Sequence, residues 1–258
     1  MASVYSALDE VTGTQVAVKL LSRSSPEVVD RFLREAEILA ELSHPAIVGH
    51  VAHGIDDGAP YLVMRWVDGV SLGELLARRR TLTVPETMSF ARAIADALGL
   101  IHARGIVHRD VKPSNIIVEA GAIDRPVLLD FGIAHLVTAS GELTRTGELL
   151  GTPGYLAPEQ ASGHEVDASA DIFALGCVLF RCLAGRSPFE ARDALAGAVK
   201  VLVEDAPRIS ERVADVPREI DELLHRMLAR DRRLRPKSGT ELTAALTTPL
   251  DPPTLDDR

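Results

Sequence analysis

The sequence has few cysteines and no long apolar run, and both shortages narrow the class of protein. Cys177 and Cys182 are the only cysteines in 258 residues, too few for a disulfide framework, so we expect a reducing, cytoplasmic setting. The longest apolar run, Ile172–Phe180, is far shorter than the roughly 20 residues of a membrane-spanning helix. The first residues also lack the basic and apolar segments of a secretion signal. We therefore expect no membrane span in this chain.

Positive charge is scarce as well. The formal net charge is −9, whereas a nucleic-acid-binding surface is usually basic, so we expect no nucleic-acid partner. Lysine occurs only at positions 19, 112, 200 and 237. Because lysine is so rare here, each of these four residues is a candidate for a role that needs its compact, mobile ammonium group. The hydrophobic share of 46% is ordinary for a globular chain, and the length suits one domain of two lobes or two small domains.

The first quarter of the chain has the pattern of a sheet with one helix. Val4–Ala7 and Gln15–Leu21 read as strands of a hairpin, and Ile47–His53 and Tyr61–Val67 as two further strands. Between the two pairs, apolar residues recur at helical spacing over Glu27–Leu42. We expect these segments to form a small lobe.

Beyond a hinge near Arg65–Gly69 the pattern becomes helical. Ser71 with Glu74, and Thr83 with Glu86, have the spacing of capping boxes, and the second opens a helix that runs to about Arg104. Residues 133–168 carry few periodic signals, and such a long irregular stretch in a compact domain is usually functional. Further helices are expected near Ala170–Ala184, Ala191–Val203 and Pro217–Ala229.

Five motifs follow one another in a fixed order. They are VAVK at 16–19, HRDVKPSN at 108–115, DFG at 130–132, GTPGY at 151–155 and APE at 157–159. This ordered set resembles the protein kinase family over the whole chain apart from its tail. The HPAIV segment at 44–48 and the VKPSN segment are most similar to bacterial serine/threonine kinases. Lys112 stands where tyrosine kinases usually carry an Ala-Ala-Arg element, which favours serine and threonine substrates.

The resemblance implies an α+β, two-lobed fold and ATP-dependent phosphorylation of protein substrates in bacterial signalling. We expect a catalytic domain over residues 1–246, with a small lobe at about 1–67 and a large lobe at about 70–246. Residues 247–258 are rich in Pro and Asp and read as a linker or tail. The expected cofactors are ATP and Mg²⁺, with Mn²⁺ as an alternative. The expected partners are protein substrates, with a homodimer as one route to autophosphorylation.

The catalytic residues carry over position by position. By resemblance, Lys19 holds the α- and β-phosphates of ATP, and Glu35 pairs with Lys19, with Glu37 or Glu41 as alternatives. By the same resemblance, Asp110 accepts the proton of the substrate hydroxyl or orients that hydroxyl, and Lys112 stabilises charge on the γ-phosphoryl group. Asn115 and Asp130 are expected to bind Mg²⁺.

The adenine pocket follows by position in the same way. The resemblance makes Met64 the gatekeeper and assigns adenine hydrogen bonds to backbone groups of Arg65 and Val67. Val4, Ala17 and Ile117 are expected to sandwich the adenine ring. Arg65 stands where the family commonly has Glu, and from this departure alone little is inferred.

Further residues are expected to regulate or support the site. By resemblance, Arg109 contacts a phosphothreonine on the activation loop, Asp130–Glu159, and we expect autophosphorylation at Thr144 and Thr146, with Thr152 a weaker candidate. Glu159 is expected to form a buried ion pair with Arg235, and Asp171 to hold the backbone of the catalytic loop.

The sequence also departs from the family pattern. Aligning Val4 with the last position of the glycine-rich loop puts Ala2 at its third glycine, and the first two glycines fall before residue 1. Either the start is an internal methionine of a longer chain or the loop is truncated. His50 stands where an aliphatic residue would pack against Leu39, Phe131 and His108.

Three functions are compatible with these observations. The leading one is a protein kinase, and its alternative is a weakly active or inactive, pseudokinase-like binding module, favoured only by the missing loop. A small-molecule kinase of related fold would generally lack the segment from Gly151 to Glu159, so we set it aside.

Overall fold

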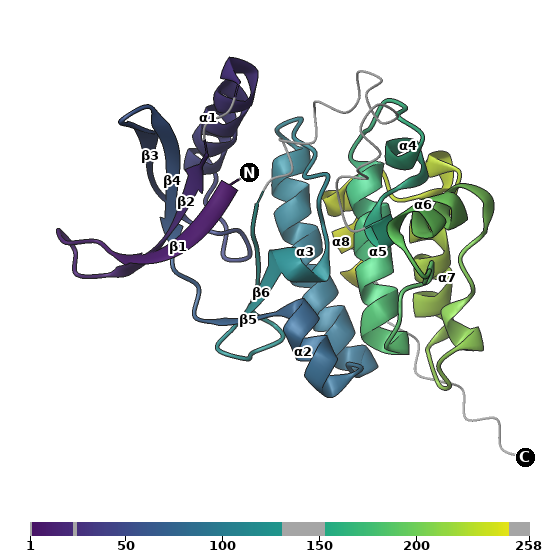
Figure 1. Ribbon diagram of the computed structural model, residues 1–258. Coiled ribbons are helices and arrows are strands. Elements are labelled where there is room, and N and C mark those ends of the chain that lie inside the picture. Colours follow the sequence, from purple (N-terminus) through teal and green to yellow (C-terminus); the bar gives the residue numbers. More distant parts are fainter. Residues whose placement is uncertain (1, 23–24, 131–152, 248–258) are drawn as a thin grey trace, which may run out of the picture.

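The computed structural model describes residues 2–22, 25–130 and 153–247. Figure 1 shows two lobes: a small one made of a sheet and one helix, and a larger one made mostly of helices. The expected α+β, two-lobed architecture is confirmed. Within the described ranges, no helix is both long enough and apolar enough to cross a membrane.

The small lobe is a four-stranded antiparallel sheet in the order β1-β2-β4-β3. Its strands are β1 Ala2–Leu8, β2 Gln15–Leu21, β3 His50–Asp56 and β4 Ala59–Arg65. Helix α1, Pro26–Ala40, packs against β3 and β4. Phe32, Ala36 and Leu39 are buried on one side of α1 because they recur at helical spacing.

A short sheet and two helices connect the lobes. The sheet contains β5 Gly69–Ser71, β6 Ile116–Glu119 and β7 Pro126–Leu128, and the helices are α2 Leu72–Arg79 and α3 Val84–His102. Both expected capping boxes are present, since Ser71 and Thr83 each accept a bond from the backbone N–H three residues later. The 3₁₀ helix η1, Pro113–Asn115, lies against α2.

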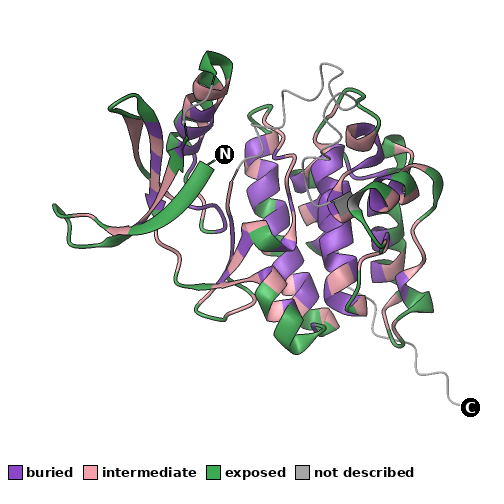
Figure 2. Cartoon of the chain, viewed as in Figure 1, coloured by how far each residue is buried: buried purple, intermediate pink, exposed green. Residues whose placement is uncertain are grey.

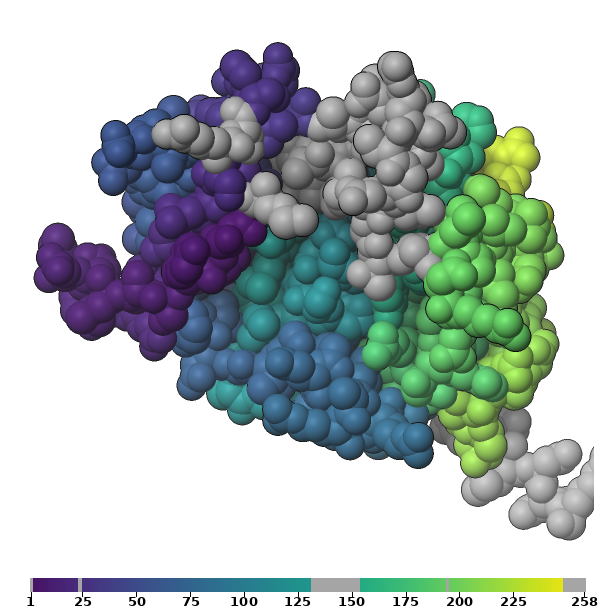
Figure 3. Space-filling view, viewed as in Figure 1, coloured from purple at the N-terminus to yellow at the C-terminus, as the bar shows by residue number. Residues whose placement is uncertain are grey.

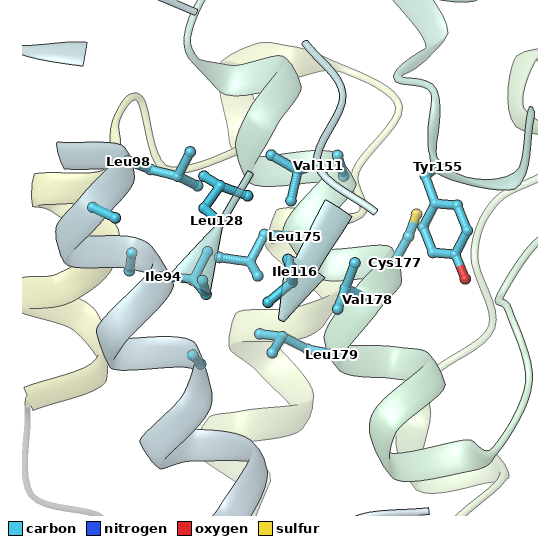
Figure 4. Packing of buried hydrophobic residues seen from close by; sticks show 14 of the residues in the cluster. Ile94, Leu98, Val111, Ile116, Leu128, Tyr155, Leu175, Cys177, Val178 and Leu179 are labelled. Atoms are coloured by element: carbon cyan, nitrogen blue, oxygen red, sulfur yellow. The ribbon is translucent and has the colours of Figure 1, made fainter. Parts of the chain in front are cut away.

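The large lobe is built around α5, Ser169–Ala184, which is buried along nearly its whole length (Figure 2). Figure 4 shows Ile94 and Leu98 of α3 beside Leu128 of β7 and Leu175 of α5. The other elements of this lobe are η4 Pro153–Tyr155, α4 Pro158–Ala161, α6 Ala194–Val203, η5 Ile209–Glu211, α7 Arg218–Met227, η6 Arg232–Leu234 and α8 Gly239–Thr247.

The last helix, α8, was not predicted from the sequence, and it packs directly on α3. At Gly239 the two helices approach so closely that a Cβ atom would lie 2.2 Å from the backbone nitrogen of Gly99 and 2.3 Å from the carbonyl oxygen of Ala95. Only glycine fits there. The signal for this contact is a pair of glycines far apart in the chain, which helical periodicity does not detect.

The expected strand at Ile47–His53 begins later than predicted. Ile47 instead forms an isolated parallel bridge with Leu128, and the N–H of Val48 donates to the carbonyl of Leu128 at 3.0 Å. These residues leave the small lobe to contact β7, so the regular strand starts only at His50. The next strand ends at Arg65 rather than Val67.

Candidate active site

Lys19 lies between two carboxylates where the lobes meet. Its Nζ is 2.9 Å from Oδ1 of Asp130, two residues after the end of β7, and 3.6 Å from Oε1 of Glu35 on α1. Burial alone would lower the pKa of Lys19, but Asp130 and Glu35 outweigh it and hold that pKa above its ordinary value. Lys19 is therefore a fixed cation that links strand β2, helix α1 and the large lobe.

The strand register places three of the residues assigned to the adenine pocket, Val4, Ala17 and Met64, on one face of the sheet, whereas Ile117 lies on β6 of the other sheet. Val4 pairs with Lys19 across β1 and β2, and Ala17 pairs with Met64 across β2 and β4. Directly paired residues share a face, and so do residues two apart in a strand. Val4 is 58% exposed, so this apolar side chain has surface left for a ligand.

A second cluster forms on the loop between α3 and β6. Nζ of Lys112 is 2.8 Å from Oδ2 of Asp110, and the side-chain amide of Asn115 donates to that same oxygen at 2.7 Å. The amide also donates to the backbone carbonyl of Asp110 at 3.0 Å. The carboxylate of Asp110 is thus held by neighbours within five residues of it.

The two clusters are joined through the backbone. The N–H of Leu129 donates to the carbonyl of Asn115 at 2.8 Å, and Asp130 follows immediately. His108 adds a second link, since its Nε2 is 2.9 Å from the carbonyl of Leu129 and its Nδ1 accepts from the N–H of Asp110 at 3.3 Å. These bonds fix Asp110 and Asp130 relative to each other.

Asp171, buried in the first turn of α5, holds the backbone ahead of Asp110. Its two carboxylate oxygens accept from the N–H groups of His108 and Arg109, both at 2.7 Å. Arg109 has a φ of 67°, in the left-handed region, so its conformation needs such support. The bonds are charge-assisted and lie away from water, where they are strong.

His102 is a residue that the sequence analysis missed. Its Nε2 is 2.9 Å from Oδ2 of Asp171, and its Nδ1 accepts from the N–H of Gly239 at 3.0 Å. This pattern assigns the ring proton to Nε2. His102 therefore connects α8 to the loop that carries Asp110, and its position six residues before that loop's HRD motif was the only signal in the sequence.

Gln160 is a second residue that the sequence analysis missed. Its side-chain amide donates to the carbonyl of Arg109 at 3.0 Å, and its Oε1 accepts from the N–H of Ala157 at 3.1 Å. One side chain thereby ties the start of α4 to the residue before Asp110.

Arg235 and Glu159 form a buried, two-pronged ion pair. The guanidinium nitrogens lie 2.7 and 3.1 Å from the two oxygens of Glu159, and Nε donates to the carbonyl of Ala229 at 2.7 Å. The guanidinium also stacks 4.8 Å from the ring of Phe173. Arg235 thus anchors α4, which follows the segment at 131–152, to the base of the large lobe.

These contacts agree with a comparison of the whole chain with known families. A family model described as a protein kinase domain matches residues 1–249. The chain belongs to the protein kinase family.

Similar proteins come from several bacteria. A probable serine/threonine-protein kinase of Streptomyces coelicolor is 38% identical over 97% of this chain and 38% of its own length, and PrkC of Bacillus subtilis is 34% identical over 100% and 40%. The chain thus spans about two fifths of these two relatives. The crystal structure of the PknI kinase domain of Mycobacterium tuberculosis is 31% identical, covers 95% of this chain and 90% of that one, and gives a TM-score of 0.74.

The hinge of this kinase-family chain carries a cross-lobe ion pair. Nη1 of Arg65, at the end of β4, is 2.6 Å from Oε1 of Glu119 on β6. The two carboxylate hydrogen bonds from Arg65 and Arg125 hold the pKa of Glu119 below its ordinary value. The backbone N–H of Arg65 is already bonded to the carbonyl of Gly49 at 2.7 Å. Arg65 therefore ties the end of β4 to β6.

His50 differs from a simple core residue. It is half-buried at the start of β3, and its Nε2 lies 2.8 Å from Nδ1 of His53. Burial and the neighbouring His53 lower the pKa of His50, which favours the neutral ring. Phe131, which was expected beside His50, lies outside the described residues, as do Gly132 and the threonines at 144, 146 and 152.

The oxygen donors near the joined clusters fit a hard divalent cation. The amide nitrogen of Asn115 is turned toward Asp110, its Oδ1 accepts only a long bond of 3.4 Å from Oγ of Ser114, and Asp130 contacts Lys19 through Oδ1 alone. Mg²⁺ is commonly bound by one or two protein oxygens together with phosphates and water. Asn115 and Asp130 provide such a set.

Proposed function

We propose that this chain transfers the γ-phosphoryl group of ATP to serine or threonine residues of proteins. The supporting observation is the bond from Leu129 to Asn115, which joins the Lys19–Glu35–Asp130 cluster to the Asp110–Lys112–Asn115 cluster. Phosphoryl transfer requires mainly positioning and charge neutralisation, and these six side chains supply both. The serine/threonine names of the similar bacterial proteins support the same substrate class.

In this proposal each cluster has a separate task. The apolar face of the sheet receives adenine, which donates a hydrogen bond to the carbonyl of Arg65 and bonds the backbone of Val67, while Lys19 holds the α- and β-phosphates. Asp110 accepts or orients the proton of the substrate hydroxyl, and Lys112 offsets charge on the transferred group. Asn115 and Asp130 would hold Mg²⁺, which neutralises phosphate charge.

Arg109 is the proposed link to activation. Burial lowers the pKa of its guanidinium despite the opposing effect of Asp171, and its side chain makes no ion pair among the described residues. A phosphothreonine brings almost two negative charges, which would compensate this cation. We propose Thr144 and Thr146 as the autophosphorylated residues, and residues 1–246 as the catalytic domain ahead of a linker.

A radiolabel assay with Mg-ATP and a threonine peptide tests the proposal. Asp110→Asn keeps the size of the side chain but removes the proton acceptor, so kcat should fall by about 10²–10⁴-fold. Asp124→Asn, at an exposed position in the β6–β7 connection, is the matched control and should retain wild-type activity. Equal rates for wild type and Asp110→Asn would contradict the proposal.

The pseudokinase-like alternative makes a different forecast for the same experiment. In that case the wild type would bind nucleotide yet transfer no label to peptide or to itself. Mass spectrometry of the incubated wild type then locates any phosphate, and active protein without modification at Thr144 or Thr146 would remove the autophosphorylation part alone.

A further inference from the structure

Arginines gather where the end of α2 meets the end of α5. Arg78, Arg79 and Arg80 are consecutive and exposed, and Arg186 is exposed just after α5. The N–H of Leu82 donates to the carbonyl of Cys182 at 2.7 Å, which ties the chain after α2 to α5.

These arginines form one surface. A Cβ atom on Gly185 would lie 3.4 Å from the carbonyl oxygen of Arg80, so Arg80 and Arg186 flank one contact. Figure 3 shows the corresponding blue and green surfaces side by side at the lower edge of the molecule. Together with Arg181, near the end of α5, they make up what we call the arginine strip, Arg78, Arg79, Arg80, Arg181 and Arg186.

Much of the positive charge of the arginine strip is not offset. Arg79 pairs with Glu86 at 2.9 Å, and Glu74 stands one turn before Arg78. By contrast, Arg80 and Arg186 have no ion-pair partner among the described residues. Arg181 donates to the hydroxyl of Tyr155 at 2.8 Å, and a neutral hydroxyl leaves the charge in place. The strip is thus a local excess of positive charge in a chain whose net charge is −9.

The arginine strip lies within reach of the catalytic loop. Gly73, in the first turn of α2, abuts Pro113, because a Cβ atom there would be 3.8 Å from Cβ of Pro113. An eight-residue helix is about 12 Å long, and an extended peptide advances about 3.3 Å per residue. A peptide whose acceptor hydroxyl lies at Asp110 would therefore reach the strip roughly four residues away.

The other end of the arginine strip borders the segment that follows residue 152. Oγ of Ser187 donates to the carbonyl of Gly154 at 3.4 Å, and Arg181 holds Tyr155 of η4. The strip consequently extends from the end of α2 to η4.

Backbone geometry at Arg80 is the second, independent observation. Its φ of 68° and ψ of −54° form a γ-turn closed by the N–H of Thr81 on the carbonyl of Arg79 at 2.9 Å. This turn is rare and strained for a residue with a side chain, and such strain concentrates at functional sites. Glycine would relieve it, yet an arginine occupies the position.

We propose that the arginine strip binds acidic side chains of the protein substrate, about three to six residues from the phosphorylated serine or threonine. This inference rests on the proposed kinase function and adds a substrate class to it. Carboxylates are planar anions, and an exposed guanidinium group binds such an anion through two hydrogen bonds.

The test compares threonine peptides that differ only in charge. One set carries Glu at positions three to six before the acceptor, a second carries Glu at the same distances after it, and a third carries Gln throughout. The full chain and its Arg80→Gln/Arg186→Gln variant are assayed for kcat/KM, and binding of labelled peptides is followed by anisotropy without ATP. Arg104→Gln is the matched control, because Arg104 is exposed beyond the opposite end of the 19-residue helix α3.

The wild type should prefer one Glu peptide over the Gln peptide by about threefold to tenfold, as two exposed ion pairs allow. The double variant should lose that preference while its rate on the Gln peptide stays unchanged, and 0.5 M salt should weaken the preference in the wild type. Equal rates and equal binding for the three peptides, or a preference that survives in the double variant, would overturn the inference but leave the kinase function intact. If no peptide were phosphorylated, the kinase function would be overturned instead. If that protein also bound the Glu and Gln peptides equally well, the inference would be overturned as well.

Discussion

Glu35 and Glu37 are two residues apart on α1, yet only one faces the site. Glu35 is buried and lies 3.6 Å from Lys19, whereas Glu37 is exposed. The ammonium of Lys19 is also held at 2.9 Å by Asp130. The structure thus gives Lys19 two partners from different lobes, and Glu35 orients it from the helix side.

Replacement of Glu35 by Gln should lower kcat/KM by about tenfold to a hundredfold, because a misplacement of about 1 Å in the reacting geometry has an effect of that size. The measurement is steady-state phosphorylation of a peptide with Mg-ATP varied. Glu37→Gln is the matched control and should behave as wild type. If the two variants lost activity equally, the assignment of Glu35 would be wrong.

At the scale of elements, the contact between α3 and α8 depends on a glycine. Gly239→Ala would push a methyl group into the backbone of α3, so we expect a loss of roughly 1–3 kcal/mol in the free energy of unfolding. Gly73→Ala is the matched control, since its Cβ would meet only ordinary contacts at 3.7–3.8 Å and alanine favours a helix. Urea unfolding followed by circular dichroism measures both, and equal stability would contradict the predicted clash.

The start of α3 should respond to acid. Bonds from Arg79 first, and then from the backbone of Thr83, lower the pKa of Glu86 from 4.5 to about 2. A carboxylate with a lowered folded-state pKa stabilises the fold above its unfolded pKa, and this contribution is lost as the pH falls from about 4.5 toward 2.

Glu86→Gln should therefore reduce stability at pH 7 by about 1 kcal/mol, and the difference from wild type should shrink below pH 4.5. Melting temperatures across this pH range give the measurement, with Glu10→Gln in the exposed β1–β2 turn as the control. A difference that stayed constant down to pH 2 would show that the charge of Glu86 is not responsible.

Sequence patterns predicted the elements that carry local signals. The capping boxes at Ser71 and Thr83 follow from residues three apart, and α1 and α5 follow from apolar spacing or a long apolar run. Helix α8 was missed because its defining contact joins residues far apart in the chain. The bond of His102 to Asp171 and the bond of Gln160 to the carbonyl of Arg109 were missed for the same reason.

The motifs predicted which residues form the candidate site, but they did not predict how those residues are placed relative to one another. Motif spacing nominated Lys19, Asp110, Asn115 and Asp130, but their mutual placement depends on β6 and β7 lying side by side. Neither the ion pair of Arg65 with Glu119 nor the pairing of His50 with His53 could be derived. The first joins strands of two different sheets, and the second lies within β3, where the register against β4 shifts between His50 and Ala52.

The whole molecule should become more stable when a nucleotide joins its lobes. A ligand at about 100 times its Kd adds about 2.7 kcal/mol, which for a chain of this size raises Tm by about 5–10 °C. The shift is measured by thermal unfolding in buffer, with ADP alone, with Mg²⁺ alone, and with ADP and Mg²⁺ together. Asp130→Asn should retain the fold but lose most of the Mg²⁺-dependent part, whereas a wild-type Tm unmoved by nucleotide would contradict binding between the lobes.

The contact of α8 with His102 also constrains how the protein is synthesised. His102 and Gly239 are 137 positions apart, so at about 5–20 residues per second the ribosome needs roughly 7–27 s to supply the partner of a helix that has already emerged. During that interval the face of α3 that α8 later covers stays open to water, and a nascent chain is then a natural client for chaperones.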